Sequence, residues 1–378
     1  DEPLSNLDAK LRAAMRTELR MEIARLPQQM TITSICYNYP TLDEKQTPIT
    51  MSALMLIPKV NGELSADSLW LENRATQSAD KNVPTHRWNI GEVHVLQNRV
   101  LVPPDLISFG ASIGRPICYC HSELAARNSV DAVLAAQVIL LAEMDISKPL
   151  PVYNSGHSQG GFDALAVHRY METQATEEGK AYFPLVRTFC ADGPYVPDTL
   201  TEIVAARDKY LYGAYMVLNA MSHLSYHPEC FTPDITIDDF LTNGARELGI
   251  AETIATKQVG NSDLVKMVMG ALGLKTSALF TEEVYRAGGR LYEMIMQCSR
   301  KERLIDGWQP TLPISFYHAH DDECVPVECM LEVQNVWGHL PNVSFEDDTT
   351  PADTIPNRMV HAYSGGVFHR ELLLKNSI

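Results

Sequence analysis

The sequence has no long uninterrupted apolar run, no Cys-x-x-Cys pair, no internal repeat and few positive charges. The longest apolar stretch, residues 132–142, is broken by Gln137 and is shorter than the roughly 20 residues that a membrane-spanning helix needs. The chain carries 31 lysines and arginines against 47 aspartates and glutamates, a net charge of −16. This charge argues against nucleic acid and anionic membrane surfaces as partners.

The eight cysteines are spread along the chain without a zinc-type spacing. Their number is too small for the dense disulfide framework of a small secreted domain. We expect buried free thiols, and one or two disulfides remain the alternative.

What is present is a chain long enough for a large core: 378 residues, 45% of them hydrophobic. Apolar residues at spacings of three and four predict a helix over residues 4–26, and β-type residues dominate 31–58. Strand and helix signals then alternate, which predicts a doubly wound, mainly parallel α/β sheet with its site at the carboxyl ends of the strands. We expect a first core part at 1–198, a helical insertion at 199–300 and a second core part at 301–378.

Residues 156–161 read Gly-His-Ser-Gln-Gly-Gly between an apolar strand signal and a helix signal over 162–173. A Gly-x-Ser-x-Gly in this context is a nucleophile elbow, in which the glycines allow a sharp turn that presents the serine. Ser158 is therefore the candidate nucleophile. We expect the side chain of His157 to point away across the turn and to pack.

A serine nucleophile needs a base and an acid that orients the base, and in this fold class both follow the serine in the chain. A loop after the β-type run at 312–317 offers Asp322, with Asp321 as its neighbouring alternative. A second loop after residue 345 ends at His361, where a catalytic histidine could reach the serine. His369, inside a helix predicted over 367–374, is the alternative base.

These motifs resemble the α/β-hydrolase superfamily, and within it the secreted lipase and esterase group. The likeness rests on 156–161, on Asp322-x-x-Val325-Pro326, on the late His361, and on the segments 102–112 and 128–136. It implies hydrolysis of a small carboxylic ester with an apolar acyl group, through an acyl-enzyme and without a cofactor or metal. Together with a start at Asp1 rather than at Met, it leads us to expect a secreted, periplasmic or cell-surface protein.

The resemblance also predicts an oxyanion hole from the backbone N–H groups of Gln159 and Ala75. Here Arg74-Ala75 stands where the family has His-Gly, and Ser108 stands where it has glycine. Arg74 could face the acyl oxygen or a substrate carboxylate. The plainer interpretation is a surface arginine paired with Glu72.

The insertion at 199–300 carries tyrosine, methionine and leucine at helical spacings. We expect a lid over the site in which Tyr215 and Met216 contact the acyl group, because such side chains form adaptable apolar surfaces. An ordinary helical subdomain with its own core is the alternative.

Three other functions fit parts of the sequence. His318-x-His320-x-Asp322 begins a metal-ligand pattern, which would suit a metallohydrolase. The departures at Arg74-Ala75 and Ser108 would suit a binding protein without catalysis. A peptidase of the same fold would use the same triad.

Overall fold

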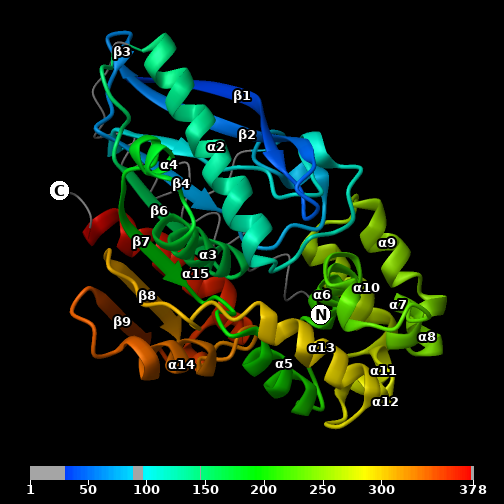
Figure 1. Cartoon of the computed structure of the whole chain (residues 1–378). Coiled ribbons are helices and arrows are strands. Elements are labelled where there is room, and N and C mark those ends of the chain that lie inside the picture. Colours follow the sequence, from blue (N-terminus) through cyan, green and yellow to red (C-terminus); the bar gives the residue numbers. More distant parts are fainter. Residues whose placement is uncertain (1–29, 88–96, 145, 376–378) are drawn as a thin grey trace.

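The computed structural model describes residues 30–87, 97–144 and 146–375. The helix predicted over residues 4–26 lies outside them. The described chain forms one mixed sheet with helices on both faces, and a second group of helices beside it (Figure 1). The predicted α/β architecture is confirmed.

The sheet has nine strands in the order β1-β2-β5-β4-β6-β7-β8-β9, and β3 pairs with β2. β2 runs antiparallel to β1, β3 and β5, whereas every neighbouring pair from β5 to β9 is parallel. The strand that precedes the elbow, β6, therefore lies inside the parallel part. The strands are β1 (Met30–Leu42), β2 (Pro48–Val60), β3 (Glu63–Leu64), β4 (Ser68–Asn73), β5 (Arg99–Val102), β6 (Val152–His157), β7 (Leu185–Ala191), β8 (Ile314–Ala319) and β9 (Val343–Asp348).

Alternating side chains of the central strands fill two cores. In β4, Leu69 and Leu71 belong to the larger core, whereas Trp70 points into the smaller one. Helices α2, α3 and α14 contribute to the larger core, and α15 covers the smaller core through Phe368 (Figure 1). The helices around the sheet are α2 (Ser122–Glu143), α3 (Gln159–Thr173), α4 (Glu177–Tyr182), α14 (Glu328–Trp337) and α15 (Val360–Lys375), with 3-10 turns η1 (Asp80–Asn82), η3 (Gly110–Ser112), η5 (Ala352–Thr354) and η6 (Pro356–Arg358).

Between β7 and β8 the chain is helical over residues 197–301, close to the predicted insertion. Within this stretch the described backbone makes β-type pairs only at two isolated bridges, Lys209–Lys275 and Leu241–Phe280. These helices lie together on one side of the sheet (Figure 1). They are α5 (Pro197–Ala206), α6 (Gly213–Tyr226), η4 (Pro228–Cys230), α7 (Ile237–Phe240), α8 (Asn243–Glu247), α9 (Ile250–Thr256), α10 (Asn261–Leu272), α11 (Thr276–Leu279), α12 (Glu282–Tyr285) and α13 (Arg290–Lys301).

Two expectations from composition can be compared with the structure. Among the described residues α2 is long and apolar enough to cross a membrane, although the sequence has no uninterrupted apolar run of that length. However, 56% of its most apolar window is buried inside the protein, as in a core helix. All eight cysteines are unpaired and seven of them are buried, as expected.

Candidate active site

Ser158 occupies the turn between β6 and α3. Its backbone has φ 61° and ψ −127°, a conformation that a side chain disfavours, and Ser158 is 5% exposed. The turn is tight: a Cβ on Gly156 would lie 1.9 Å from the carbonyl oxygen of Gly160, and one on Gly160 would lie 2.1 Å from the carbonyl oxygen of Asn73. The glycines of the motif are therefore required by close backbone contact, as an elbow predicts.

The structure brings Ser158, His361 and Asp322 together. The Ser158 hydroxyl lies 2.8 Å from Nε2 of His361, and Nδ1 of His361 lies 2.6 Å from Oδ2 of Asp322. The other carboxylate oxygen of Asp322 accepts from the backbone N–H groups of Cys324 at 2.7 Å and Val325 at 2.9 Å. These two bonds hold the carboxylate with one oxygen directed at the imidazole.

His361 belongs to helix α15 and not to the preceding loop, so the sequence assigned it to the wrong element. Helix α15 begins at Val360, seven residues before the predicted start. The Oε2 atom of Glu323 accepts from the N–H groups of Val360 at 2.8 Å and His361 at 3.1 Å. A carboxylate on these unpaired N–H groups stabilises the helix start, and it fixes His361 next to the acid loop.

The alternative residues lie elsewhere. Asp321 is exposed, and its Oδ2 accepts from the N–H of Ala352 at 3.2 Å. His369 is buried further along α15, where burial and the charges of His157 and Arg74 lower its pKa to about 3. Neither residue takes part in the hydrogen bonds that join Ser158 to Asp322.

A second buried carboxylate, Asp192, stands directly after β7 beside the same histidine. Its Oδ1 accepts from the N–H of Ala319 at 2.9 Å, and its Oδ2 lies 3.2 Å from Nε2 of His157. The ring of His157 packs against the ring of His361 at 4.7 Å between centroids. His157 therefore packs, as predicted, but against the proposed base rather than away from it. Sequence reasoning missed Asp192, although it follows a strand at the carboxyl edge where the site was expected.

Two buried carboxylates around two imidazoles set the electrostatics of the site. Burial raises the pKa of Asp322, and the charge of Asp192 raises it further. Burial alone would raise the pKa of Asp192 as well, but the hydrogen bond from His157 and the charges of His318 and His157 bring it below its ordinary value. Burial lowers the pKa of His361, and the negative charges of Asp192 and Glu323, which raise it, offset only part of this effect. The imidazole of His361 is therefore neutral at neutral pH, as a general base must be.

The two segments that carry the predicted oxyanion donors lie against each other at the elbow. Gln159 is the first residue of α3, so its N–H has no acceptor within the helix. Ala75 follows the end of β4, and the close contact of Gly160 with Asn73 brings this segment against the elbow. The oxyanion hole formed by the N–H groups of Gln159 and Ala75 stays a prediction.

Arg74 is buried, contrary to the interpretation as a surface arginine. It is 5% exposed, and its Nη1 lies 3.5 Å from Oε1 of Glu72, so the predicted partner is present. Glu72 shares the direction of Trp70 in β4, toward the face that α15 covers, and Arg74 follows the end of this strand. The Nε and Nη2 atoms of Arg74 have no hydrogen-bond acceptor among the described residues.

Ser108 has φ 87°, which is a glycine-type conformation. Its N–H donates to Oγ of Ser112 at 3.0 Å, and its own hydroxyl donates to the carbonyl of Pro116. The departure from glycine is thus accommodated by two hydrogen bonds in the same loop. The backbone turn that the family pattern implies is kept.

Tyrosines of the helical insertion lie over the acid loop. The ring of Tyr212 lies edge-on to His361 at 6.2 Å, and its hydroxyl donates to Oε1 of Glu323 at 2.9 Å. Tyr215 is buried and stacks on Tyr212 at 5.4 Å, whereas Met216 is half-buried against the core. Tyr212, which no motif singled out, is thus the insertion residue in contact with the proposed base.

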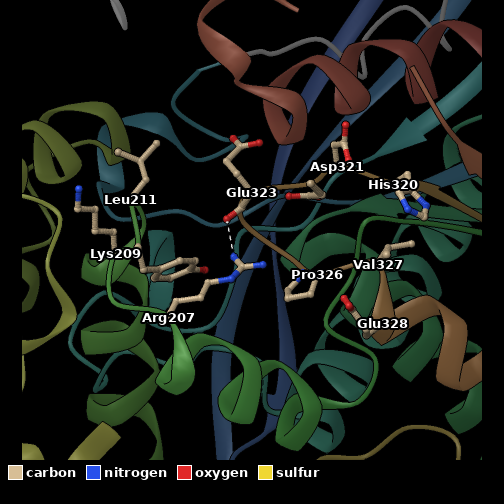
Figure 2. Close-up of a pocket in the computed structure, with 11 residues that line it drawn as sticks. Arg207, Lys209, Leu211, His320, Asp321, Glu323, Pro326, Val327 and Glu328 are labelled. Carbon is tan, nitrogen blue, oxygen red and sulfur yellow. Dashed lines mark hydrogen bonds between the residues drawn. The ribbon is translucent and has the colours of Figure 1, made fainter. Parts of the chain in front are cut away.

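A cavity of about 510 Å³ lies beside the acid loop (Figure 2). Positively and negatively charged side chains line it. Asp322 is one of the lining residues, whereas Ser158 and His361 are not. Figure 2 shows Arg207 donating to the backbone carbonyl of Glu323, at 3.1 Å. The lining residues are Arg207, Lys209, Tyr210, Leu211, His320, Asp321, Asp322, Glu323, Pro326, Val327 and Glu328.

The metal-ligand pattern His318-x-His320-x-Asp322 does not converge. His318 is fully buried, whereas the half-exposed His320 lies 3.0 Å from Asp347. Asp192 takes the place of His320 beside His318 and Asp322, with ligand atoms within 4.8 Å of one another. Because Oδ2 of Asp322 is bonded to His361, this group belongs to the hydrogen-bonded site around Ser158.

Comparisons with known proteins place this geometry in a fold. No protein-family model matches the chain, and a search of curated proteins finds no match. A point mutant of the rice cell wall degrading esterase LipA from Xanthomonas oryzae is similar over 93% of this chain and 92% of that chain, at 18% identity and a TM-score of 0.75. A ligand-bound form of LipA matches over 95% of both chains, at 17% identity and a TM-score of 0.74.

A third solved structure, lipase A of Candida antarctica, is similar over 84% of this chain and 72% of that chain, at 14% identity and a TM-score of 0.60. The chain has the α/β-hydrolase fold. Within this fold Ser158 lies in the turn between β6 and α3, as the predicted elbow requires.

Proposed function

We propose that the chain is a serine hydrolase that cleaves carboxylic esters. The observation that carries the proposal is the hydrogen-bonded series Ser158 Oγ, His361 Nε2 and Nδ1, and Asp322 Oδ2, with distances of 2.8 and 2.6 Å. Ser158 attacks the ester carbonyl while His361 takes its proton and then gives it to the leaving alkoxide. A water then attacks the acyl-enzyme while His361 takes its proton; the bond between the acyl carbon and Ser158 Oγ breaks, His361 returns the proton to Oγ, and the carboxylic acid leaves. Asp322 holds the imidazole in the required tautomer.

The oxyanion of each tetrahedral intermediate would accept from the N–H groups of Gln159 and Ala75. Losing one such donor costs roughly two to three orders of magnitude in kcat. Because this chain has Arg74-Ala75 where the family has His-Gly, the position of the Ala75 N–H bears directly on the rate. Similarity to LipA and to Candida antarctica lipase A supports an ester as the substrate class.

The insertion at 199–300 is proposed to be a lid, with the core formed by residues 1–198 and 301–378. Ser158 and His361 are 5% and 8% exposed, and Tyr212 lies against His361, so the insertion has to shift for a substrate to enter. Tyr215 and Met216 are then candidates to contact an apolar acyl group of a small ester. The similar LipA is described as degrading rice cell walls, which supports a protein exported from the cell.

The test is covalent labelling by a fluorophosphonate probe together with hydrolysis of p-nitrophenyl esters of increasing chain length. We expect labelling of Ser158, turnover on esters, and loss of both in Ser158→Ala. His369→Asn and Asp321→Asn are matched controls that should keep both. A folded protein that is not labelled would be a binding protein, and labelling with turnover only on peptides would make it a peptidase.

A further inference from the structure

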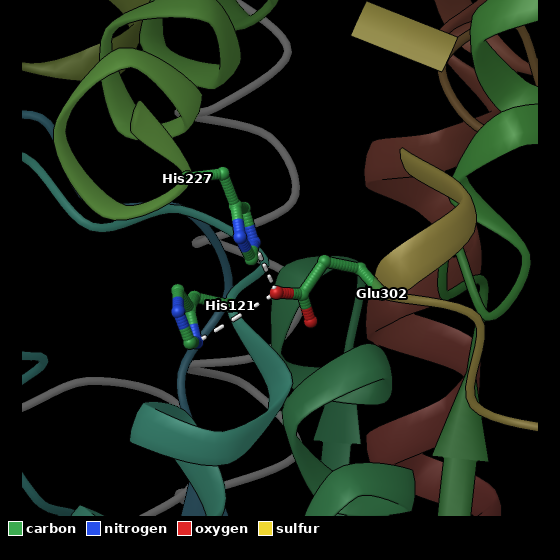
Figure 3. Close-up of side chains that lie close together, drawn as sticks. All are labelled: His121, His227 and Glu302. Carbon is green, nitrogen blue, oxygen red and sulfur yellow. Dashed lines mark hydrogen bonds and ion pairs between the residues drawn. The ribbon is translucent and has the colours of Figure 1, made fainter. Parts of the chain in front are cut away.

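Two histidines and a glutamate from distant parts of the chain meet where the helical insertion contacts the core (Figure 3). His121 directly precedes α2 in the core, His227 directly follows α6 in the insertion, and Glu302 directly follows α13. All three are largely or fully buried, and one ligand atom from each lies within 4.8 Å of the other two. Figure 3 shows both imidazoles directed at the same carboxylate.

The distances suit a shared cation. Oε1 of Glu302 lies 2.6 Å from Nε2 of His227 and 3.7 Å from Nδ1 of His121. Ligand atoms at about 2.0–2.1 Å from a tetrahedral zinc ion lie about 3.3 Å apart. These two spacings therefore need changes of less than about 1 Å, and the spacing between the two histidines, which is within 4.8 Å, needs a change of at most about 1.5 Å.

Further groups hold the ligands in orientation. Oε2 of Glu302 accepts from the N–H of Ser122 at 2.7 Å, which leaves Oε1 directed at the histidines. Nδ1 of His227 lies 3.4 Å from Oε1 of Glu229, which leaves Nε2 as the atom that faces Glu302. A carboxylate behind a metal-bound histidine is the usual support of such a ligand.

A third histidine, His223, lies beside this group. It stands in the last turn of α6, four residues before His227, which follows the helix. It is 2% exposed, its Nε2 has no hydrogen-bond partner among the described residues, and its ring lies 5.8 Å from that of His227. A buried nitrogen without a hydrogen-bond partner costs free energy, and this one stands beside the proposed ligand His227.

We propose that His121, His227 and Glu302 bind one divalent transition-metal ion of the zinc class. Two imidazoles and one carboxylate, with a water in the fourth position, are a ligand set that proteins use for zinc. Because the ligands come from both the core and the insertion, the ion ties the base of the proposed lid to the sheet domain. This site does not depend on the proposed esterase activity.

The experiment titrates zinc chloride into the full-length protein after chelator treatment and dialysis, with calorimetry and thermal unfolding as readouts. We expect one ion per chain and a higher Tm with zinc, since an ion that binds only the folded state stabilises it. Because loss of a supporting residue alone costs about 10–100-fold in metal affinity, His227→Gln and Glu302→Gln should weaken binding by at least about 100-fold. The matched control is His168→Gln, which alters another buried histidine paired with a glutamate, Glu172.

Zinc binding that is absent, or that is equally tight in the three variants, would overturn the proposal. If the ligand variants do not fold, cobalt(II) added to the unaltered chain decides: absorption bands of a tetrahedral site support it, and the spectrum of the hexahydrated ion refutes it. Fluorophosphonate labelling of Ser158 in the same samples reports the esterase proposal separately.

Discussion

Asp322→Asn is the change that tests the proposed triad most directly. Asparagine keeps an oxygen to accept from the N–H groups of Cys324 and Val325, so the acid loop keeps its shape. Its amide nitrogen, however, replaces the oxygen that lies 2.6 Å from Nδ1 of His361. The amide N–H then donates to Nδ1, the imidazole proton moves to Nε2, and Nε2 can no longer accept the proton of Ser158.

The magnitude follows from the wrong tautomer. The same change in a serine protease lowers kcat about 10⁴-fold, which corresponds to about 5.5 kcal/mol of transition-state stabilisation. We expect a comparable fall in kcat on p-nitrophenyl esters, with KM nearly unchanged. The control is Asp321→Asn, which changes an exposed neighbour. Full activity of Asp322→Asn together with inactivity of Asp321→Asn would refute the assignment of the acid.

The same variant separates catalysis from stability. Burial and the charge of Asp192 raise the pKa of Asp322 in the folded protein. A raised folded pKa means that stability falls as the pH rises from the ordinary value of about 3.9 through the raised one. Asparagine removes this penalty, so Asp322→Asn should melt no lower than the wild type at pH 8, and any gain should vanish near pH 3.5. Inactivity with a strongly lowered Tm would contradict this reasoning.

Three further predictions follow from neighbouring residues. Asp192→Asn removes a charge that raises the pKa of His361, so the acid limb of kcat/KM should move to lower pH; an unmoved or raised limb would contradict the role of Asp192. Arg74→Ala leaves Glu72 buried without its ion-pair partner and should lower the free energy of unfolding in urea by about 3–5 kcal/mol. The added change Glu72→Gln should restore part of this loss. Equal losses of activity on acidic and neutral esters would exclude substrate recognition by Arg74. Tyr215→Ala and Met216→Ala should shift the preferred acyl length but keep fluorophosphonate labelling, and a lower Tm with unchanged preference would make the insertion purely structural.

The sequence predicted the elements that local patterns determine. The elbow could be found because its glycines, its serine and the flanking strand and helix lie within about twenty consecutive residues. The parallel sheet could be found because buried strands alternate with helices. The order of the strands, by contrast, is set by pairing between distant segments, and no local pattern contains it.

The errors share a physical cause in long-range contacts. Helix α15 begins at Val360 because Glu323, from a distant loop, accepts from its first N–H groups. Arg74, for which a surface position was one of two interpretations, is buried because it follows β4, which lies between β5 and β6 inside the sheet. Tyr212 reaches His361 only because the insertion folds back over the acid loop.

The strand order also explains why one site holds two aspartates, and hydrogen bonding decides which of them serves the histidine. β7 and β8 are parallel neighbours beside β6, so Asp192 and Asp322 follow adjacent strands at the edge that carries Ser158. Oδ1 of Asp192 accepts from the N–H of Ala319, and its Oδ2 lies 3.2 Å from Nε2 of His157 rather than next to His361. Oδ1 of Asp322 accepts hydrogen bonds from its own loop, and Oδ2 lies 2.6 Å from Nδ1 of His361. We therefore propose Asp322 as the acid that sets the tautomer, and we expect Asp192 to act on His361 through its charge and through the packing of His157.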